Sequence, residues 1–313
     1  MRSISVEHYC TNQAYKYHIM INYPKITIVT PSYNQGQFLE QTILSVLGQN
    51  YPNLEYIIID GESTDNSVEI IKKYEKHLKY WVSEPDKGQS DAINKGFSHS
   101  SGDILAWINS DDMYIPGVLN YIPEIITQTR LGIFFGNCIH FTMHKNTLVS
   151  FGSDVVEKSN SIKLNNYDYI IQPSTFWTRD TWVKVGKLRE DMHFVFDWEW
   201  FLRAEDTGIP FFPIQFPLSI YRIHDSHKTG TGGIKRQQEI AYIYSIYNQR
   251  IVLLYDKLCK EDIIGNTLTY KLYEKLLSKF SSKGTLGGYL KIVKFLKYRG
   301  YTHHDIDMTN QMK

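Results

Sequence analysis

Residues 25–30 read KITIVT, and this run of β-branched and apolar residues decides the fold class. Such a run predicts a strand that is buried in the core. Leu39, Ile43 and Val46 then follow at helical spacing, and residues 55–59 (EYIII) predict a second buried strand. The alternation continues with elements expected at 68–78 (helix), 80–82 (strand), 92–97 (helix) and 102–108 (strand). Strands and helices that alternate in this way predict a three-layer α/β/α sandwich with a mainly parallel central sheet.

The regular alternation of strands and helices is confined to residues 25–108. Residues 1–24 are expected to form an irregular polar lead-in, and residues 230–313 a helical C-terminal extension. Between them, short strands are expected after Leu131, at 132–141 and 148–151 and onward to about Ile223, with a helix near 198–205. Residues 25–229 therefore predict one main domain that carries an extension at its C-terminal end.

Composition limits the classes of function. The chain has 313 residues, 42% of them hydrophobic, and a formal net charge of +1. A nucleic-acid-binding domain usually carries a strong basic excess, so we expect no nucleic-acid partner. The three cysteines are far apart and odd in number, which argues against a disulfide framework. We see no signal peptide and no run of about 20 apolar residues, so a cytoplasmic location is expected.

Polar residues follow each of the four strands predicted first. They read PSYN at 31–34, DGESTD at 60–65, SEPDKG at 83–88 and NSDD at 109–112. Ligands of an open α/β sheet bind outside the carboxyl ends of its strands, so these segments predict a binding site. Helix capping is the simpler explanation for Ser63–Ser67, because a helix must begin there.

Capping explains Asp111 and Asp112 poorly. Two adjacent carboxylates at the end of a buried strand repel each other and are tolerated best beside a cation or hydrogen-bond donors. Oxygen ligands favour a hard cation such as Mg²⁺ or Mn²⁺, whose shell is commonly completed by substrate phosphates. The chain has neither GxGxxG nor GxxxxGK[ST], so the other common phosphate-binding loops are absent from the sequence. A metal-bound nucleotide diphosphate is the expected ligand.

From about Lys25 to Thr229, the chain resembles the inverting GT-A fold glycosyltransferases of family two. The resemblance rests on the order and spacing of six segments: TPSYNQGQFLEQTILSVLGQ, IIIDGESTD, SEPDKGQSDAINKG, GDILAWINSDD, FDWEWFLR and YRIHDSHKTG. It implies the GT-A (Rossmann-like) version of the predicted sandwich, with a nucleotide-sugar half at 25–130 and an acceptor half at 131–229.

The resemblance also implies the donor site. Asp60 would accept a hydrogen bond from the nucleotide base, which is often uracil, so a UDP-sugar is the expected donor. The residues against the base and ribose would be Pro31, Ser32 and Tyr33. Those that frame the nucleotide-sugar pocket would be Lys87, Gly88, Asp91 and Asn94.

The acidic segment matches the end of the family's metal motif. By this resemblance one of Asp111 and Asp112 lies near the ribose or sugar and the other binds Mn²⁺ or Mg²⁺. The family often has a further Asp where this chain has Asn109, so the assignment within the motif stays open. Arg222 and His224 match a late basic motif near the diphosphate and the metal.

Asp197 matches the catalytic base of the family, which lies just ahead of a Leu-Arg pair. The preceding residue is often Glu, and here it is Phe196. Inversion in one step requires that the acceptor hydroxyl lose its proton on the face opposite the leaving group, and a carboxylate is the usual base. Glu199 is the alternative base. The alternative without catalysis is that Asp197 only caps its helix.

By the same resemblance, the expected acceptor is a saccharide or a lipid-linked saccharide, most commonly in the assembly of surface polysaccharides. Residues 286–299 (LGGYLKIVKFLKYR) are basic and apolar. They predict either peripheral contact with the inner face of a membrane or packing on the catalytic domain.

Two other functions remain as alternatives. A nucleotidyltransferase acting on sugar phosphates would carry a cation-rich loop after the first strand, and TPSYNQGQF lacks those cations. A non-catalytic nucleotide-sugar-binding protein would need no base such as Asp197.

Overall fold

The computed structural model describes residues 3–8, 15–20, 23–126, 128–144, 147–225, 227–228, 232–265, 301, 305, 308–309 and 311–312. The chain forms two compact units. The first comprises Met1–Lys158 and Ile170–Asp225, and the second comprises Ser159–Tyr169 and Ser226–Lys313.

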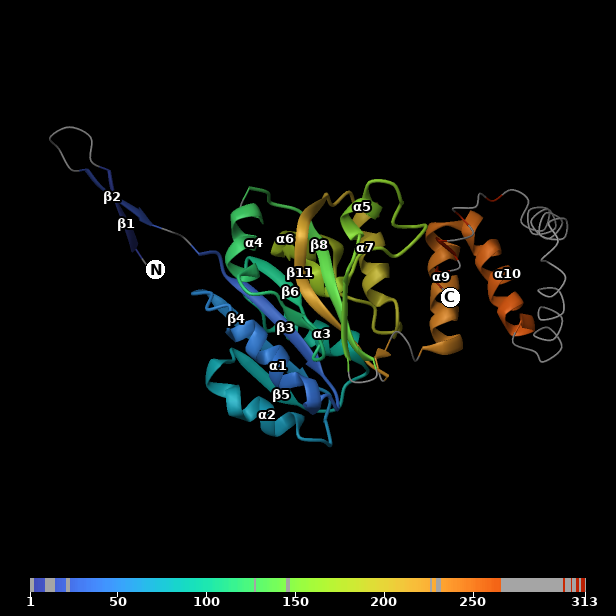
Figure 1. Ribbon diagram of the computed structural model, residues 1–313, viewed down its shortest axis with the longest axis horizontal. Helices are drawn as coiled ribbons and strands as arrows, with labels where there is room; N and C mark the ends of the chain where they lie inside the picture. Colours follow the sequence, from blue (N-terminus) through green and yellow to red (C-terminus); the bar gives the residue numbers. More distant parts are fainter. Residues whose placement is uncertain are drawn as a thin grey trace. The chain divides into compact units, whose positions relative to one another are not determined.

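A mixed sheet forms the centre of the first unit (Figure 1). Within the described residues it has nine strands in the order β5-β4-β3-β6-β10-β8-β11-β7, with β9 paired to β8. Their bounds are β3 (Ile26–Ser32), β4 (Leu54–Asp60), β5 (Tyr80–Ser83), β6 (Ile104–Trp107), β7 (Met113–Tyr114), β8 (Ile133–His144), β9 (Thr147–Gly152), β10 (Thr175–Thr178) and β11 (Phe211–Ile223).

The strand directions determine which ends meet. β3 is parallel to β4 and β6, and β4 is parallel to β5. β10 is antiparallel to both β6 and β8, and β11 is parallel to β8. β8 and β11 therefore run in the same direction as β3 to β6, so all these strands end at one edge of the sheet.

Helices cover both faces of this sheet (Figure 1). They are α1 (Gly36–Leu47), α2 (Ser67–Tyr74), α3 (Gln89–Ser98), α4 (Val118–Ile126), α5 (Val155–Ser159), α6 (Arg179–Val185) and α7 (Phe196–Asp206), with 3₁₀ turns η1 (Glu75–His77) and η2 (Gln172–Ser174). On one face, Ile28 and Ile58 share a buried cluster with Leu39 of α1, Ile71 of α2 and Leu119 of α4.

The other face carries α3, α6 and α7. Their aromatic rings interlock with the sheet: the centroid of Phe97 lies 4.6 Å from that of Trp182, and Trp200 lies 5.0 Å from Trp177. A Cβ atom on Gly96 would lie 2.4 Å from Cγ1 of Val29, so only glycine allows α3 to approach β3 this closely. The predicted three-layer sandwich is confirmed.

The N-terminal lead-in differs from the sequence prediction. Residues expected to be irregular form an antiparallel hairpin of β1 (Ser3–His8) and β2 (Tyr15–Met20), with Ser3 opposite Met20. The segments SISVEH and YKYHIM alternate polar and apolar residues, which is the period of a strand.

β11 is longer than the short strands expected in this region. It runs through Pro213 and Pro217, and its register against β8 shifts between Ile214 and Pro217 and again between Pro217 and Ser219. Proline cannot donate to a ladder and is tolerated at such irregularities, so one irregular strand replaces the shorter ones expected.

The second unit contains two long helices among its described residues. α9 (Gly233–Tyr247) and α10 (Gln249–Gly265) pack through Tyr244 and Tyr255, whose ring centroids are 5.4 Å apart. No helix in the described ranges combines the length and hydropathy needed to cross a bilayer. The basic segment 286–299 lies outside the described residues.

Candidate functional site

The carboxyl ends of the strands gather the polar residues predicted from the sequence. Ser32, Asp60 and Ser83 lie in register at the ends of β3, β4 and β5. Asp112 follows β6, which is parallel to β3, and its Oδ1 accepts a hydrogen bond at 3.2 Å from the backbone N–H of Arg222 on β11. The predicted common edge for Asp60 and the acidic segment is therefore found.

Asp60 is buried and its carboxylate is held by the loop that it begins. Its Oδ1 accepts from the Ser63 hydroxyl at 2.6 Å, and its Oδ2 accepts from the Ser63 N–H at 2.9 Å and the Ser83 hydroxyl at 2.7 Å. These three donors fix the orientation of the carboxylate. A carboxylate has about four acceptor positions, so one position remains for a further donor.

The end of β3 offers an aromatic ring and a hydroxyl. Pro31 and Ser32 are buried, whereas the Tyr33 side chain is 63% exposed. The Ser32 hydroxyl is buried without a hydrogen-bond partner in the part of the chain that the structure describes. Buried hydroxyls normally have a partner, so this one is consistent with a ligand contact.

Asp86 belongs to the same region, and the sequence reasoning missed it. A Cβ atom on Gly61 would lie 2.7 Å from Asp86 Oδ2, so glycine lets this carboxyl approach the loop after Asp60. Burial raises the pKa of Asp86, and the negative charges of Asp91 and Asp60 add to the effect. Only its place in the SEPDKG segment signalled it, because nothing in the sequence reports its burial.

Lys87 and Gly88 form a tight turn before α3, and Asp91 lies in the first turn of that helix. Gly88 has φ +122°, and its N–H donates to Asp86 Oδ1 at 2.8 Å, while the Lys87 N–H donates to Asp91 Oδ2 at 3.0 Å. The Lys87 side chain is exposed and its Nζ lies 3.6 Å from Glu190 Oε2. Asp91 therefore holds the backbone of the turn, and the Lys87 ammonium stays accessible.

Asn94 is another residue predicted to frame the nucleotide-sugar pocket. It is buried, and its amide bonds both backbone groups of Leu188, donating to the carbonyl at 2.9 Å and accepting from the N–H at 2.9 Å. Its contacts therefore anchor the segment between α6 and α7 against α3.

The two carboxylates after β6 have different surroundings. Asp111 Oδ2 lies 3.0 Å from His224 Nε2, and the Asp111 side chain is 19% exposed. Asp112 is buried, and its carboxyl accepts from the Asn109 amide at 3.2 Å as well as from Arg222. Burial, and secondly the charge of Asp111, raise the pKa of Asp112 well above its usual range.

Arg222 connects β11, α1 and the acidic segment. Its Nε donates to the Asp111 carbonyl at 3.1 Å, and its guanidinium lies 4.7 Å from the ring centroids of both Phe38 and Phe141. Burial lowers the pKa of Arg222, while Asp111 and Asp112 oppose that shift. Phe38 also contacts His224, with ring centroids 4.6 Å apart, so the two basic residues share one aromatic support.

Asp111 and His224 are the residues that fit a metal. Within the described residues there is no group of three or more His, Cys, Asp and Glu side chains that could hold an ion. Mg²⁺ is usually bound by one or two carboxylates, with substrate phosphates and water completing its shell. Asp111 supplies one such carboxylate, and the imidazole of His224 lies beside it.

The start of α7 also presents two carboxylates in different surroundings. Asp197 is half-buried, and its Oδ1 accepts from the Trp198 N–H at 2.9 Å. Glu199 is buried, and Arg203 bonds both of its oxygens, at 3.1 and 2.9 Å. Arg203 also donates to the carbonyl of Val185 at 2.6 Å. Glu199 is therefore engaged in holding Arg203 against the segment after α6.

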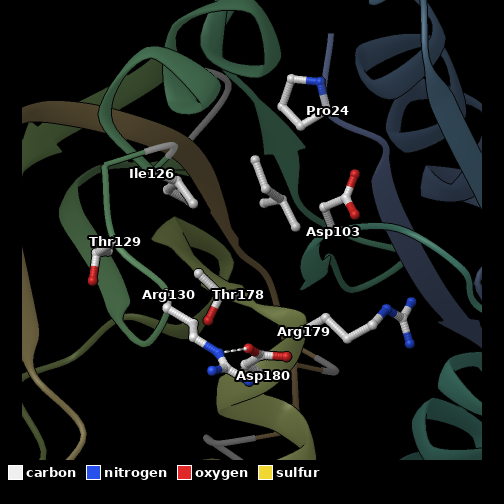
Figure 2. Close-up of a pocket in the computed structure, with 9 residues that line it drawn as sticks. Pro24, Asp103, Ile126, Thr129, Arg130, Thr178, Arg179 and Asp180 are labelled. Carbon is white, nitrogen blue, oxygen red and sulfur yellow. Dashed lines mark hydrogen bonds and ion pairs between the residues drawn. The ribbon is translucent and has the colours of Figure 1, made fainter. Parts of the chain in front are cut away.

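A hollow of about 270 Å³ lies elsewhere in the first unit, and Figure 2 shows its lining. Pro24 and Asp103 come just before β3 and β6, so the hollow lies at the amino ends of these strands, opposite the candidate site. Arg130 and Asp180 form an ion pair within it (Figure 2). The hollow therefore does not belong to the chemistry at the carboxyl edge.

Comparison with known proteins relates the first half of the chain to a family. The family model described as Glycosyl transferase family 2 matches residues 27–182. An uncharacterized glycosyltransferase of Mycobacterium tuberculosis (strain CDC 1551 / Oshkosh) is 40% identical over 110 residues. That match covers 35% of this chain and 40% of the relative, so the chain aligns with less than half of the relative's length.

Two solved structures share the architecture. TarS 1-349 of S. aureus, solved in complex with UDP-GlcNAc, has a TM-score of 0.59 at 14% identity and covers 73% of this chain and 66% of its own. Mannosyltransferase PcManGT of Pyrobaculum calidifontis, solved with GDP-Man and Mn²⁺, has a TM-score of 0.61 at 14% identity and covers 93% and 86%. At these identities the likeness establishes the fold alone.

Proposed function

This chain belongs to glycosyltransferase family 2 and has a GT-A-like fold, and we propose that it transfers a sugar with inversion from a UDP-sugar to a saccharide or lipid-linked acceptor. The observation that carries the proposal is the meeting of Asp111, Arg222 and His224 at the sheet edge that also holds Asp60. A carboxylate, an imidazole and a guanidinium at one point suit a metal-bound diphosphate.

The nucleotide would lie across the ends of β3 and β4. Asp60 has one acceptor position left beside its three internal donors, which suits the single N–H of uracil. The exposed Tyr33 ring offers a stacking surface for the base, and the Ser32 hydroxyl offers a polar contact for the base or ribose. Lys87 and Gly88, at the start of α3, would border the sugar-diphosphate.

Asp111 and His224 would hold Mn²⁺ or Mg²⁺ beside the diphosphate. When bound, the ion would neutralise the charge that develops on the leaving diphosphate. The buried Asp112 would act indirectly, by positioning Arg222. Its carboxyl accepts a hydrogen bond from the backbone N–H of Arg222, and the Arg222 side chain donates to the carbonyl of Asp111. We therefore propose Asp111 rather than Asp112 as the carboxylate ligand.

Asp197 would be the general base. It would take the proton of the acceptor hydroxyl while that oxygen bonds to the anomeric carbon and the bond from that carbon to the diphosphate oxygen breaks. A half-buried carboxylate at a helix start can reach substrate, whereas both oxygens of Glu199 are already bonded by Arg203. The geometry thus favours Asp197 over its neighbour.

The test is release of nucleoside diphosphate from a panel of UDP-sugars and GDP-sugars in the presence of saccharide and lipid-linked saccharide acceptors, with Mn²⁺, with Mg²⁺ or with EDTA. We expect metal-dependent release from one UDP-sugar, and loss of that release in the variant Asp197→Asn. Binding without release would favour the non-catalytic binding protein. Release of pyrophosphate from UTP and a sugar phosphate would favour the nucleotidyltransferase.

We propose a cytoplasmic site of action in surface-polysaccharide assembly, with a lipid-linked acceptor bringing the enzyme to the inner face of the membrane. The support is the family's common setting, as implied by the resemblance. Co-sedimentation with vesicles that carry or lack a lipid-linked saccharide tests it, and equal recovery in both pellets would contradict recruitment by the lipid-linked acceptor.

A further inference from the structure

A series of contacts along the carboxyl edge of the sheet leads from Asp60 to the loop between α6 and α7. A Cβ atom on Gly61, which follows Asp60, would lie 2.7 Å from Asp86 Oδ2. The other oxygen of Asp86 accepts from the Gly88 N–H at 2.8 Å. A Cβ atom on Gly88 would in turn lie 3.4 Å from Nδ1 of His193 and 3.8 Å from its Cε1. The exposed imidazole of His193 therefore lies against the turn that begins α3.

The loop between α6 and α7, which carries His193, is fixed in this place by polar contacts. Asn94 of α3 bonds the backbone carbonyl and N–H of Leu188, each at 2.9 Å, and its Nδ2 lies 3.3 Å from Glu190 Oε1. The other oxygen of Glu190 lies 3.6 Å from Lys87 Nζ. Since these contacts join the loop to α3 and to its first turn, the position of His193 beside that turn is supported on the same side.

The turn beside His193 also contacts the acidic segment. Gln89, the residue after Gly88, donates from its Nε2 to Asn109 Oδ1 at 2.7 Å. In the other direction, His193 comes four residues before Asp197, and four residues span at most about 14 Å of chain. His193 therefore joins the turn that would border the sugar-diphosphate to the segment that carries the proposed general base.

We propose that His193 forms a hydrogen bond with a hydroxyl group of the sugar being transferred and so helps to select the donor. A donor whose uracil lies at Asp60 must extend along this edge until its anomeric carbon meets the acceptor at Asp197, and His193 lies on that path. A neutral imidazole has one nitrogen that donates and one that accepts, which suits a hydroxyl group. The role rests on the proposed function, because the nucleotide and the general base define where the sugar lies.

The contact would distinguish sugars that differ at one hydroxyl, as glucose and galactose do, because a site built to bond a hydroxyl disfavours a sugar that places it elsewhere. The variant His193→Ala removes the ring without disturbing the core, since the side chain is exposed. His193→Gln keeps a donor and an acceptor. His99→Ala is the matched control, because His99 is also exposed but lies at the opposite end of α3 from Gly88.

Calorimetry on the full chain with Mn²⁺, and without acceptor, measures the affinity for UDP, UDP-glucose, UDP-galactose, UDP-GlcNAc and UDP-GalNAc. We expect His193→Ala to lower the affinity for the UDP-sugar that the wild type binds most tightly by about threefold to tenfold, the value of one hydrogen bond, and to reduce the differences among the sugars. The affinity for UDP itself should not change. His193→Gln and His99→Ala should bind all five nucleotides nearly as the wild type does.

The proposal is overturned if His193→Ala binds that UDP-sugar as tightly as the wild type does. It is also overturned if the affinity for UDP falls equally, because His193 would then act on the diphosphate or on the fold, or if only the KM for the acceptor rises. In each of these cases, metal-dependent UDP binding and turnover by the wild type would leave the proposed function standing. A wild type that binds none of the five nucleotides would overturn both.

Discussion

The segment after β6 and the start of α7 each present two carboxylates close together in sequence, and in both regions the structure separates them. Asp112 and Glu199 are buried and bonded within the protein, the first by Asn109 and Arg222 and the second by Arg203. Asp111 and Asp197 are each only partly buried. In both regions one carboxylate is buried and bonded within the protein, and its neighbour is partly exposed.

The two regions differ in how the buried carboxylate is neutralised. Glu199 has a full cationic partner, since Arg203 bonds both of its oxygens. Among the described residues the carboxyl of Asp112 receives a backbone N–H and a side-chain amide, so burial and the charge of Asp111 raise its pKa and favour the protonated form. The first arrangement is an internal ion pair, and the second needs a proton or a nearby cation.

The largest expected effect comes from removing the proposed base. Asp197→Asn keeps the size of the side chain but cannot take a proton at neutral pH. We expect transfer to fall by about 10²–10⁴-fold, which is the usual contribution of general-base catalysis, with donor affinity nearly unchanged. Initial rates and donor titrations measure the two quantities. Near-normal transfer by Asp197→Asn would mean that Asp197 is not the general base and would favour Glu199 in that role.

The next largest effect should separate Asp111 from Asp112. Asp111→Asn should lower the affinity for UDP in the presence of Mn²⁺ by about 10–100-fold, the range seen when a metal site loses a ligand or its support. Asp112→Asn, a neutral replacement of a carboxyl whose pKa is raised, should cost less. Calorimetry with Mn²⁺ and with EDTA measures both. Equal losses of UDP affinity in the two variants, or a wild-type affinity that EDTA does not change, would contradict the proposal that Asp111 rather than Asp112 binds the metal.

The sequence predicted which regions carry the site better than it predicted the separate tasks of neighbouring residues. Polar residues at the ends of β3, β4 and β6 could be located because apolar runs show where buried strands end. The burial of Asp112 could not be predicted, because it depends on Arg222, which is 110 residues away, and on Thr42 of α1, whose hydroxyl bonds the Asp112 carbonyl at 2.7 Å.

Glu199→Gln should affect stability more than rate. The amide can keep one hydrogen bond to Arg203 but loses the charge that balances a partly buried guanidinium, so the free energy of unfolding should fall by about 2 kcal/mol. Transfer should stay within about threefold of the wild type, because Arg203 keeps its bonds to the carbonyls of Val185 and Lys187. Urea unfolding and initial rates test this. An inactive but stable variant would give Glu199 the catalytic role.

The smallest expected effect extends the comparison to Asp60 and Asp86. Burial raises the pKa of Asp86, with Asp91 and Asp60 adding to the effect, so the folded state binds this proton more tightly than the unfolded chain does. The resulting stabilisation is present below a pH of about 3.9 and is lost as the pH rises through the higher pKa of the folded state. At neutral pH the ionised carboxylate is a cost, and Asp86→Asn removes it while an amide oxygen can still accept from the Gly88 N–H. We expect the melting temperature of Asp86→Asn to rise by about 1–2 °C at pH 7 and to match that of the wild type near pH 3.5.

Asp60→Asn is the control, and its melting temperature at pH 7 should fall. The Asp60 carboxylate accepts three hydrogen bonds, and an amide cannot keep all of them. A lower melting temperature for Asp86→Asn at pH 7 would mean that the ionised carboxylate of Asp86, like that of Asp60, is held by the fold.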